Sequence, residues 1–147
     1  MPVNALSLTI SEVLQRANGV KKLEDKVKIL RENNSLALRD ILKVGFDDTV
    51  ALDLPEGAPV YKKNSKESIP STLHKQTPKF KYFVKGNIFV QPMPKAKLEN
   101  MFIGILESID PDDAELVVKA KDKKISELYP RIPKKTVMEA FPGLIRA

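Results

Sequence analysis

The sequence predicts a mainly α protein: a compact single domain of five to six short helices with a short extended arm and a basic connector. Apolar residues recur at spacings of three and four in several segments, as they do on one face of a helix. The 11 prolines against 6 glycines suit short helices joined by stiff connectors. A length of 147 residues with 42% hydrophobic content is enough for one core. We expect helices over 10–45, the arm and connector over 46–93, and helices again over 94–147, within one domain 1–147.

The first predicted helix covers residues 10–18, because Thr9 and Glu12 form a capping-box pattern ahead of a periodic apolar run. The next segment has a single apolar stripe, formed by Val20, Leu23, Val27 and Leu30. Polar residues 33–35 interrupt this pattern before it resumes as far as Gly45. The pattern predicts two consecutive helices, or one bent helix, packed against the first.

The middle of the chain changes to extended and then irregular patterns. Apolar residues alternate at Val50, Leu52 and Leu54 ahead of the turn-rich string PEGAP, which predicts a short extended arm. Residues 62–70 have no apolar period, which indicates a mobile loop. Residues 78–85 fit a helical face, although a hairpin around the Gly-Asn pair that follows is the alternative.

Three helices are predicted in the C-terminal part. The first starts at Pro94 and has an apolar stripe formed by Leu98, Met101, Phe102, Ile105, Leu106 and Ile109. The second has Asp110 at its N-cap and Pro111 in its first turn. The last begins near Pro133, and its contact side is formed by Val137, Met138 and Phe141.

Positive charge is concentrated in the middle of the chain. Residues 61–97 hold nine lysines and one acid, Glu67, a local charge of +8, whereas the whole chain carries +6. Six acids follow within 98–118. The distribution predicts either a polyanionic partner or neutralisation of the lysines by the protein's own acids.

Aromatic residues are interleaved with these lysines, which favours contact with single-stranded nucleic acid, because lysines neutralise phosphates and flat rings stack on unpaired bases. The candidate binding residues are Lys62, Lys63, Lys75, Lys79, Lys81, Tyr82 and Lys85. The alternative is that Phe80 and Phe83, at helical spacing, belong to the core and that the lysines form an ordinary solvated face.

A second basic cluster follows the acidic segment. It consists of Lys119, Lys121, Lys123, Lys124, Arg131, Lys134 and Lys135. Two helices joined by a basic connector loosely resemble a duplex-reading motif, but this connector is longer than that motif's tight turn. Cations near a helix end are ordinary partners of the helix dipole.

No catalytic motif is present, and we expect no enzyme activity, no cofactor and no metal site. The chain has no cysteine, a single histidine (His74), and no phosphate-loop or dinucleotide glycine pattern. The acids Asp110, Asp112, Asp113 and Glu115 lack the glycine and alternating ligands of a calcium loop, and helix capping accounts for Asp110 and Asp113. The N-terminal sequence lacks the pattern of a signal peptide, and no apolar run is long enough for a membrane span.

Six short strings resemble a family of small uncharacterised proteins of myovirus-type tailed bacteriophages, including cyanobacterial phages. They are NSLALRDIL (34–42), LPEGAPVY (54–61), FVKG (83–86), DPDDAEL (110–116), KDKK (121–124) and EAFPGL (139–144). The resemblance implies a phage origin and action in the cytoplasm of the infected bacterial host, or in the virion. It implies no reaction and no site residues.

The expected function is therefore that of a non-enzymatic phage accessory protein, a nucleic-acid-binding or host-takeover module. One alternative is a virion structural or assembly protein whose oppositely charged segments pair between subunits. Another is an inhibitor or adaptor that docks a host enzyme through one amphipathic helix. We expect no membrane partner, and the sequence leaves homo-oligomerisation open.

Overall fold

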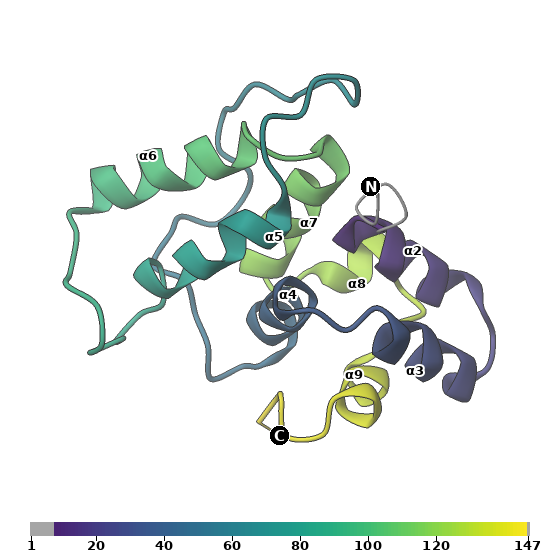
Figure 1. The fold of residues 1–147 in the computed structure, drawn as a ribbon. Helices are drawn as coiled ribbons and strands as arrows, with labels where there is room; N and C mark the ends of the chain where they lie inside the picture. Colours follow the sequence, from purple (N-terminus) through teal and green to yellow (C-terminus); the bar gives the residue numbers. More distant parts are fainter. Residues whose placement is uncertain (1–7, 147) are drawn as a thin grey trace.

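The predicted apolar stripes meet in one hydrophobic core around a central helix (Figure 1). The computed structural model describes residues 8–146. Within these residues there are eight α-helices and one 3-10 helix, η1. They are α2 (Ile10–Gly19), α3 (Leu23–Glu32), α4 (Leu36–Phe46), α5 (Leu73–Gln76), η1 (Thr77–Tyr82), α6 (Lys95–Leu106), α7 (Pro111–Lys121), α8 (Ile125–Leu128) and α9 (Lys134–Ala140).

The mainly helical class is confirmed, but the predicted count of five to six helices is too low. The additional helices α5 and α8 are each four residues long. Because one helical turn is shorter than the window over which apolar periodicity becomes visible, the sequence pattern did not reveal them.

The helix starts follow the local signals in the sequence. The Thr9 side chain accepts a hydrogen bond from the Glu12 backbone N–H, and the Glu12 carboxylate accepts one from the Thr9 backbone N–H, so the capping box of α2 is confirmed. Ser35 caps α4, and α3 and α4 are two separate helices. Of these two, α3 packs against α2, whereas α4 packs mainly against α7.

The predicted stripe of α3 is only partly correct. Leu30 is buried, but Val27 is half-buried and Leu23 is 39% exposed. The buried neighbour of Leu30 is Lys26, whose ammonium donates to the carbonyls of Ala17 and Val20 at the end of α2. A lysine can bury its aliphatic stem while its ammonium donates to carbonyl oxygens. Lys26 is therefore buried on α3, where the apolar pattern predicted Leu23 and Val27 to be.

The segment predicted as an extended arm pairs at one residue with the segment that follows η1, and bends follow at 53–54 and 56–57. Leu52 and Val84 form an isolated antiparallel bridge, with hydrogen bonds from the Asp53 N–H to the Phe83 carbonyl (2.7 Å) and from the Lys85 N–H to the Ala51 carbonyl (2.8 Å). No longer strand forms within residues 8–146. The helical interpretation of residues 78–85 is thus confirmed as far as Tyr82. The alternative, a hairpin, does not form, because Val84 pairs with Leu52 of the arm.

The connector 62–70, predicted to be a mobile loop, forms no helix or strand and is fastened to the region between α6 and α7. The Asn64 amide donates to the carbonyls of Glu107 (2.8 Å) and Ile109 (2.9 Å). The Lys66 ammonium lies 2.6 Å from the Asp112 carboxylate. These contacts hold the connector across the end of α6.

In the C-terminal part, α7 is the central helix and packs against α2, α4, α6 and α8. Its start is as predicted, because Asp110 accepts hydrogen bonds from the N–H groups of Asp112 and Asp113. The expected contact side of α9 is wrong at Met138, which is 37% exposed, since only one side of this short helix faces the protein. No helix within residues 8–146 is long and apolar enough to cross a membrane.

Candidate nucleic-acid interface

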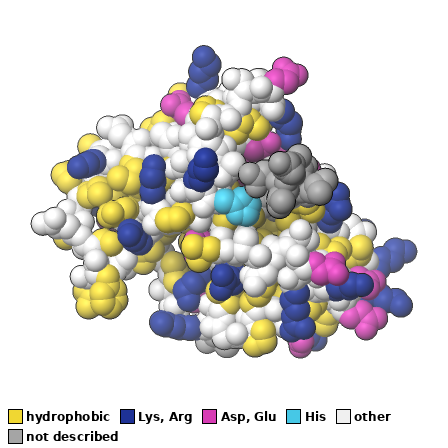
Figure 2. Space-filling model, viewed as in Figure 1, with side chains coloured by type: hydrophobic (Ala, Val, Ile, Leu, Met, Phe, Trp, Pro, Cys, Tyr) yellow, Lys and Arg dark blue, Asp and Glu magenta, His cyan; other side chains and the backbone are white. Residues whose placement is uncertain are grey.

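All six candidate lysines of the middle segment are exposed. Within residues 8–146, none of their ammonium groups forms an ion pair, although Lys66 and Lys95 of the same segment do. Figure 2 shows more Lys and Arg than Asp and Glu side chains on the face where α5 and α6 lie, with hydrophobic side chains between them. The charge of this segment is therefore largely available to an external anion.

The helical run formed by α5 and η1 has a buried side and a basic side. Leu73, Thr77 and Phe80 face the core. Lys75 and Lys79 are four residues apart and exposed, which places them along the opposite side of this run. The local sequence thus folds as an amphipathic helix whose polar side is cationic.

Two of the five aromatic rings of this segment, those of Phe80 and Phe83, are in the core, as the alternative interpretation predicted. Phe80 and Phe83 are buried, and Phe83 makes an edge-to-face contact with Phe102 at 5.7 Å between ring centroids. Tyr61 is half-buried, and burial together with the nearby Glu115 raises the pKa of its hydroxyl. Phe80 and Phe83 therefore cannot stack on a base.

Two rings remain at the surface beside lysines. Tyr82 is half-buried, and the Lys81 ammonium lies 5.3 Å from the centre of its ring. Tyr82 and Lys81 line a depression of about 460 Å³ together with Phe89 and Lys97. No acidic residue lines this depression. It combines the two features that single-stranded nucleic acid requires, flat rings and cations.

Phe89 and Lys97 were absent from the candidate residues proposed from sequence. Both belong to the lysine-rich segment with interleaved aromatics, and that pattern was the signal for them. Their position in the depression depends on how the chain returns from η1 to α6. Sequence spacing does not specify this path.

The structure does not bring all seven candidate residues together. Lys81 and Tyr82 lie beside Lys97 in the first turn of α6. The Lys62 backbone N–H donates to the Glu107 carboxylate (2.8 Å), just past the other end of α6. This separates Lys62 and its neighbour Lys63 from the depression by about 15 Å along the helix axis. A nucleic-acid strand bound in the depression can reach Lys62 and Lys63 only if it runs along α6.

The second basic cluster is used within the protein. Lys119 pairs with Glu127 (2.7 Å), Lys124 with Glu56 (3.3 Å) and Lys134 with Asp48 (3.5 Å). This part of the charge distribution matches the prediction of internal neutralisation.

Two further lysines of this cluster bind backbone carbonyl groups. The Lys121 ammonium donates to the carbonyls of Pro55 and Gly57 in the arm and also pairs with Asp122. The Lys123 ammonium donates to three carbonyls at and after the end of α4, those of Val44, Asp47 and Val50. The string KDKK (121–124) therefore fastens the arm and α4 to α7, which favours a structural role over duplex recognition.

The acids of the α7 N-terminus act as caps and pairing groups. The prediction that Asp113 caps its own helix is wrong. Asp113 is buried, and its carboxylate accepts a hydrogen bond from the Ser11 backbone N–H in α2 (2.9 Å). Burial raises the pKa of Asp113 to about 6. Residues 8–146 contain no group of three or more His, Cys, Asp or Glu side chains placed to hold a metal ion. His74 is exposed on α5.

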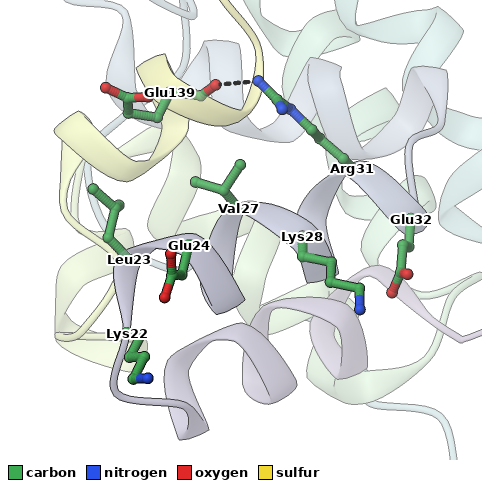
Figure 3. A pocket seen from close by; sticks show the side chains of 8 residues that line it. All are labelled: Lys22, Leu23, Glu24, Val27, Lys28, Arg31, Glu32 and Glu139. Atoms are coloured by element: carbon green, nitrogen blue, oxygen red, sulfur yellow. Dashed lines mark hydrogen bonds between the residues drawn. The ribbon is translucent and has the colours of Figure 1, made fainter.

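A separate groove of about 780 Å³ lies between α3 and α9 (Figure 3). Leu23 and Val27 project from α3 toward α9, and Arg31 donates to the Glu139 carbonyl (2.8 Å). The charged side chains around the groove are Lys22, Lys28, Arg31, Glu24, Glu32 and Glu139. Three cations and three acids make its rim neutral overall.

Most of the chain matches the model of one known protein family. Residues 13–127, more than three quarters of its length, match the model described as "Family of unknown function (DUF6433)". The chain belongs to this family. No curated protein and no solved structure matches it.

The DUF6433 match contains every candidate binding residue, from Lys62 to Lys85, as well as Phe89 and Lys97. It also contains the structural lysines of the KDKK string and ends before α9. The basic depression therefore lies within the DUF6433 region, whereas the α9 side of the groove lies outside it.

Proposed function

We propose that this chain is a non-enzymatic accessory protein that binds single-stranded nucleic acid in the cytoplasm of a phage-infected bacterium. The phage setting is supported by the six short strings that resemble myovirus proteins. The binding role is supported by the lysine-rich face of α5 and η1. Membership of DUF6433 assigns neither.

The observation that carries this proposal is the contrast between the two basic clusters. Five of the seven cations in the second cluster bind acids or carbonyl groups of the protein itself, through Lys119, Lys121, Lys123, Lys124 and Lys134. Within residues 8–146, the six lysines of the candidate interface make no ion pair. Unpaired cations on a structured surface are the groups that exchange counterions for phosphates.

A single strand suits this surface better than a duplex. The half-buried ring of Tyr82 and the exposed ring of Phe89 line a depression, where an unpaired base can reach them and a paired base cannot. Stacking on a ring is open to every base, because every base has a flat face. We therefore expect binding with little sequence preference.

A titration with fluorescently labelled single-stranded DNA at increasing salt concentrations tests the proposal. Affinity should fall steeply with salt, because each phosphate contact contributes roughly 0.7 to the slope of log affinity against log salt concentration. Duplex DNA of the same length should bind more weakly. Absence of binding at low salt would refute the nucleic-acid role.

A second candidate function is self-association in a virion or assembly intermediate, and the groove between α3 and α9 favours it. The groove combines the half-exposed Leu23 and Val27 with a rim of three cations and three acids. A surface of balanced charge can be complementary to itself across a two-fold axis, so the occupant would be a second copy of this chain.

Sedimentation at moderate salt tests this second candidate. The wild-type protein should form a dimer and Val27→Glu a monomer, while Lys135→Glu, on the exposed side of α9, should leave the dimer intact. Detection of the protein in purified particles would add a virion role. The inhibitor or adaptor role would be favoured instead if the wild type is a monomer that binds a specific host enzyme and the Val27→Glu variant does not bind that enzyme.

A further inference from the structure

Phe89 occupies an unusual position for a phenylalanine. Its side chain is 90% exposed, and the adjacent Ile88 is 86% exposed. A single exposed apolar side chain is common and needs no explanation. Phe89 differs from Ile88 in that it lines the basic depression together with Tyr82, Lys81 and Lys97, whereas Ile88 does not.

The segment that carries Phe89 is fastened to the segment that carries Tyr82. The Asn87 amide donates to the Lys81 carbonyl (3.0 Å), and its oxygen accepts a hydrogen bond from the Phe89 backbone N–H (3.0 Å). Gly86, with φ of +75°, makes the preceding turn in a conformation that favours glycine. The one Asn87 side chain thereby fixes Phe89 relative to Lys81 and Tyr82 before any ligand binds.

The charges around the depression are of one sign. Its ionisable lining residues are Lys81, Tyr82 and Lys97, and no carboxylate is among them. The Lys81 ammonium is held 5.3 Å from the centre of the Tyr82 ring. The phosphates on either side of a nucleotide whose base lies in the depression would therefore meet cations close to the rings.

We propose that this depression is a subsite for one unpaired nucleotide, with the base against Phe89 and Tyr82 and the flanking phosphates on Lys81 and Lys97. The inference rests on the proposed single-strand binding and names its central subsite. The volume of about 460 Å³ falls within the range of pockets that hold small ligands, roughly 300 to 1,000 Å³. Asn87 is a positioning residue that holds Phe89 in place.

An anionic membrane surface is the competing ligand for an apolar tip among lysines. A membrane would bury the side chains of both Ile88 and Phe89, because these adjacent residues are both exposed. A nucleotide in the depression would use Phe89 and not Ile88. The two neighbouring residues therefore form a matched pair for the test.

The experiment compares a labelled 15-nucleotide oligothymidylate with an abasic phosphodiester chain of the same length, by anisotropy at fixed salt. Phe89→Ala should bind the oligothymidylate about tenfold more weakly, the loss expected for one stacked base. It should bind the abasic chain like the wild type and keep the wild-type salt slope. Phe89→Trp should retain affinity, Asn87→Ala should lose part of it, and Ile88→Ala should behave like the wild type.

Each other result overturns the inference in a recognisable way. If Phe89→Ala binds the oligothymidylate like the wild type while charge reversal of the lysines abolishes binding, the nucleotide subsite is wrong and the proposed function stands. If the wild type binds neither chain, both are wrong. If Ile88→Ala and Phe89→Ala lose binding to phosphatidylserine vesicles equally and bind the oligothymidylate like the wild type, the tip is a membrane contact.

Discussion

The buried carboxylate of Asp113, in the first turn of α7, accepts a 2.9 Å hydrogen bond from the backbone N–H of Ser11, in the first turn of α2. One acidic side chain thus satisfies an N–H group at the start of a helix about a hundred residues away in sequence. The contact joins the N-terminal helix to the central helix of the core.

This contact predicts a pH-dependent stability. Burial raises the pKa of Asp113 from 3.8 to about 6, so between these values the folded protein holds a proton that the unfolded chain has released. The contribution of Asp113 is therefore greatest below pH 3.8 and declines by about 3 kcal/mol as the pH rises through 6. Urea unfolding from pH 4 to pH 7 should show Asp113→Asn gaining stability relative to the wild type. A constant difference between the two proteins would contradict the assignment.

Asp47 should show the opposite dependence on pH. Its burial alone would raise the pKa, but hydrogen bonds from Thr49 and the Arg146 backbone N–H, together with the Lys43 ammonium, lower it to about 2. The carboxylate therefore stabilises the fold above pH 3.8, and this contribution is lost as the pH falls through 2. Asp47→Asn should lower the free energy of unfolding at pH 7 by about 2 kcal/mol. Equal stability of the two proteins at pH 7 would argue against this network.

Replacement of Lys123 should destabilise the protein strongly. Its ammonium donates to the carbonyls of Val44, Asp47 and Val50, and Lys123→Met would leave these acceptors without their donor. The expected loss is about 2 to 3 kcal/mol, measured by urea unfolding. Lys135→Met, at an exposed site on α9, is the control and should unfold like the wild type. A small effect of Lys123→Met would show that water donates to these carbonyls in place of the ammonium.

A side chain at Gly45 should destabilise the protein. A Cβ at this position on α4 would overlap the Cδ1 atom of Ile125 on α8. Gly45→Ala should cost about 1 to 3 kcal/mol, as overpacking of a core does, and Ile125→Val in the same chain should recover part of that loss. A double-mutant cycle measures the coupling, and strictly additive effects would show that the two helices do not meet there.

Elements with local signals could be predicted from the sequence. Asp110 and Pro111 specify the start of α7 through groups within three residues of one another, and Thr9 with Glu12 does the same for α2. The burial of Phe80 followed from helical spacing within one short run. Such features depend on neighbours in sequence, so they need no knowledge of the tertiary fold.

Features that depend on distant partners could not be predicted. The acceptors of Lys123 lie more than seventy residues earlier, and nothing in the string KDKK distinguishes this lysine from the surface-exposed lysines of the middle segment. Leu23 belongs to a regular apolar stripe, yet its side chain is 39% exposed. The exposure of Phe89 is equally invisible, since an apolar residue between apolar neighbours is expected inside. Phe89 was missed as a candidate binding residue for this reason.

The central claim is that the lysines of α5 and η1 contact a polyanion. The most direct measurement compares two triple variants with the same change in net charge, titrated against single-stranded DNA over a range of salt concentrations. One variant carries Lys75→Glu, Lys79→Glu and Lys81→Glu. The control reverses Lys21, Lys28 and Lys135, which are exposed and form no ion pair within residues 8–146.

The first variant should lose affinity and have a salt slope smaller by about 2, the value for three lost contacts to a single strand. The control should retain the wild-type slope, because its lysines lie on α9 and in or beside α3, away from the depression. Equal losses in both variants would mean that only net charge matters, and that result would contradict a specific interface on this face.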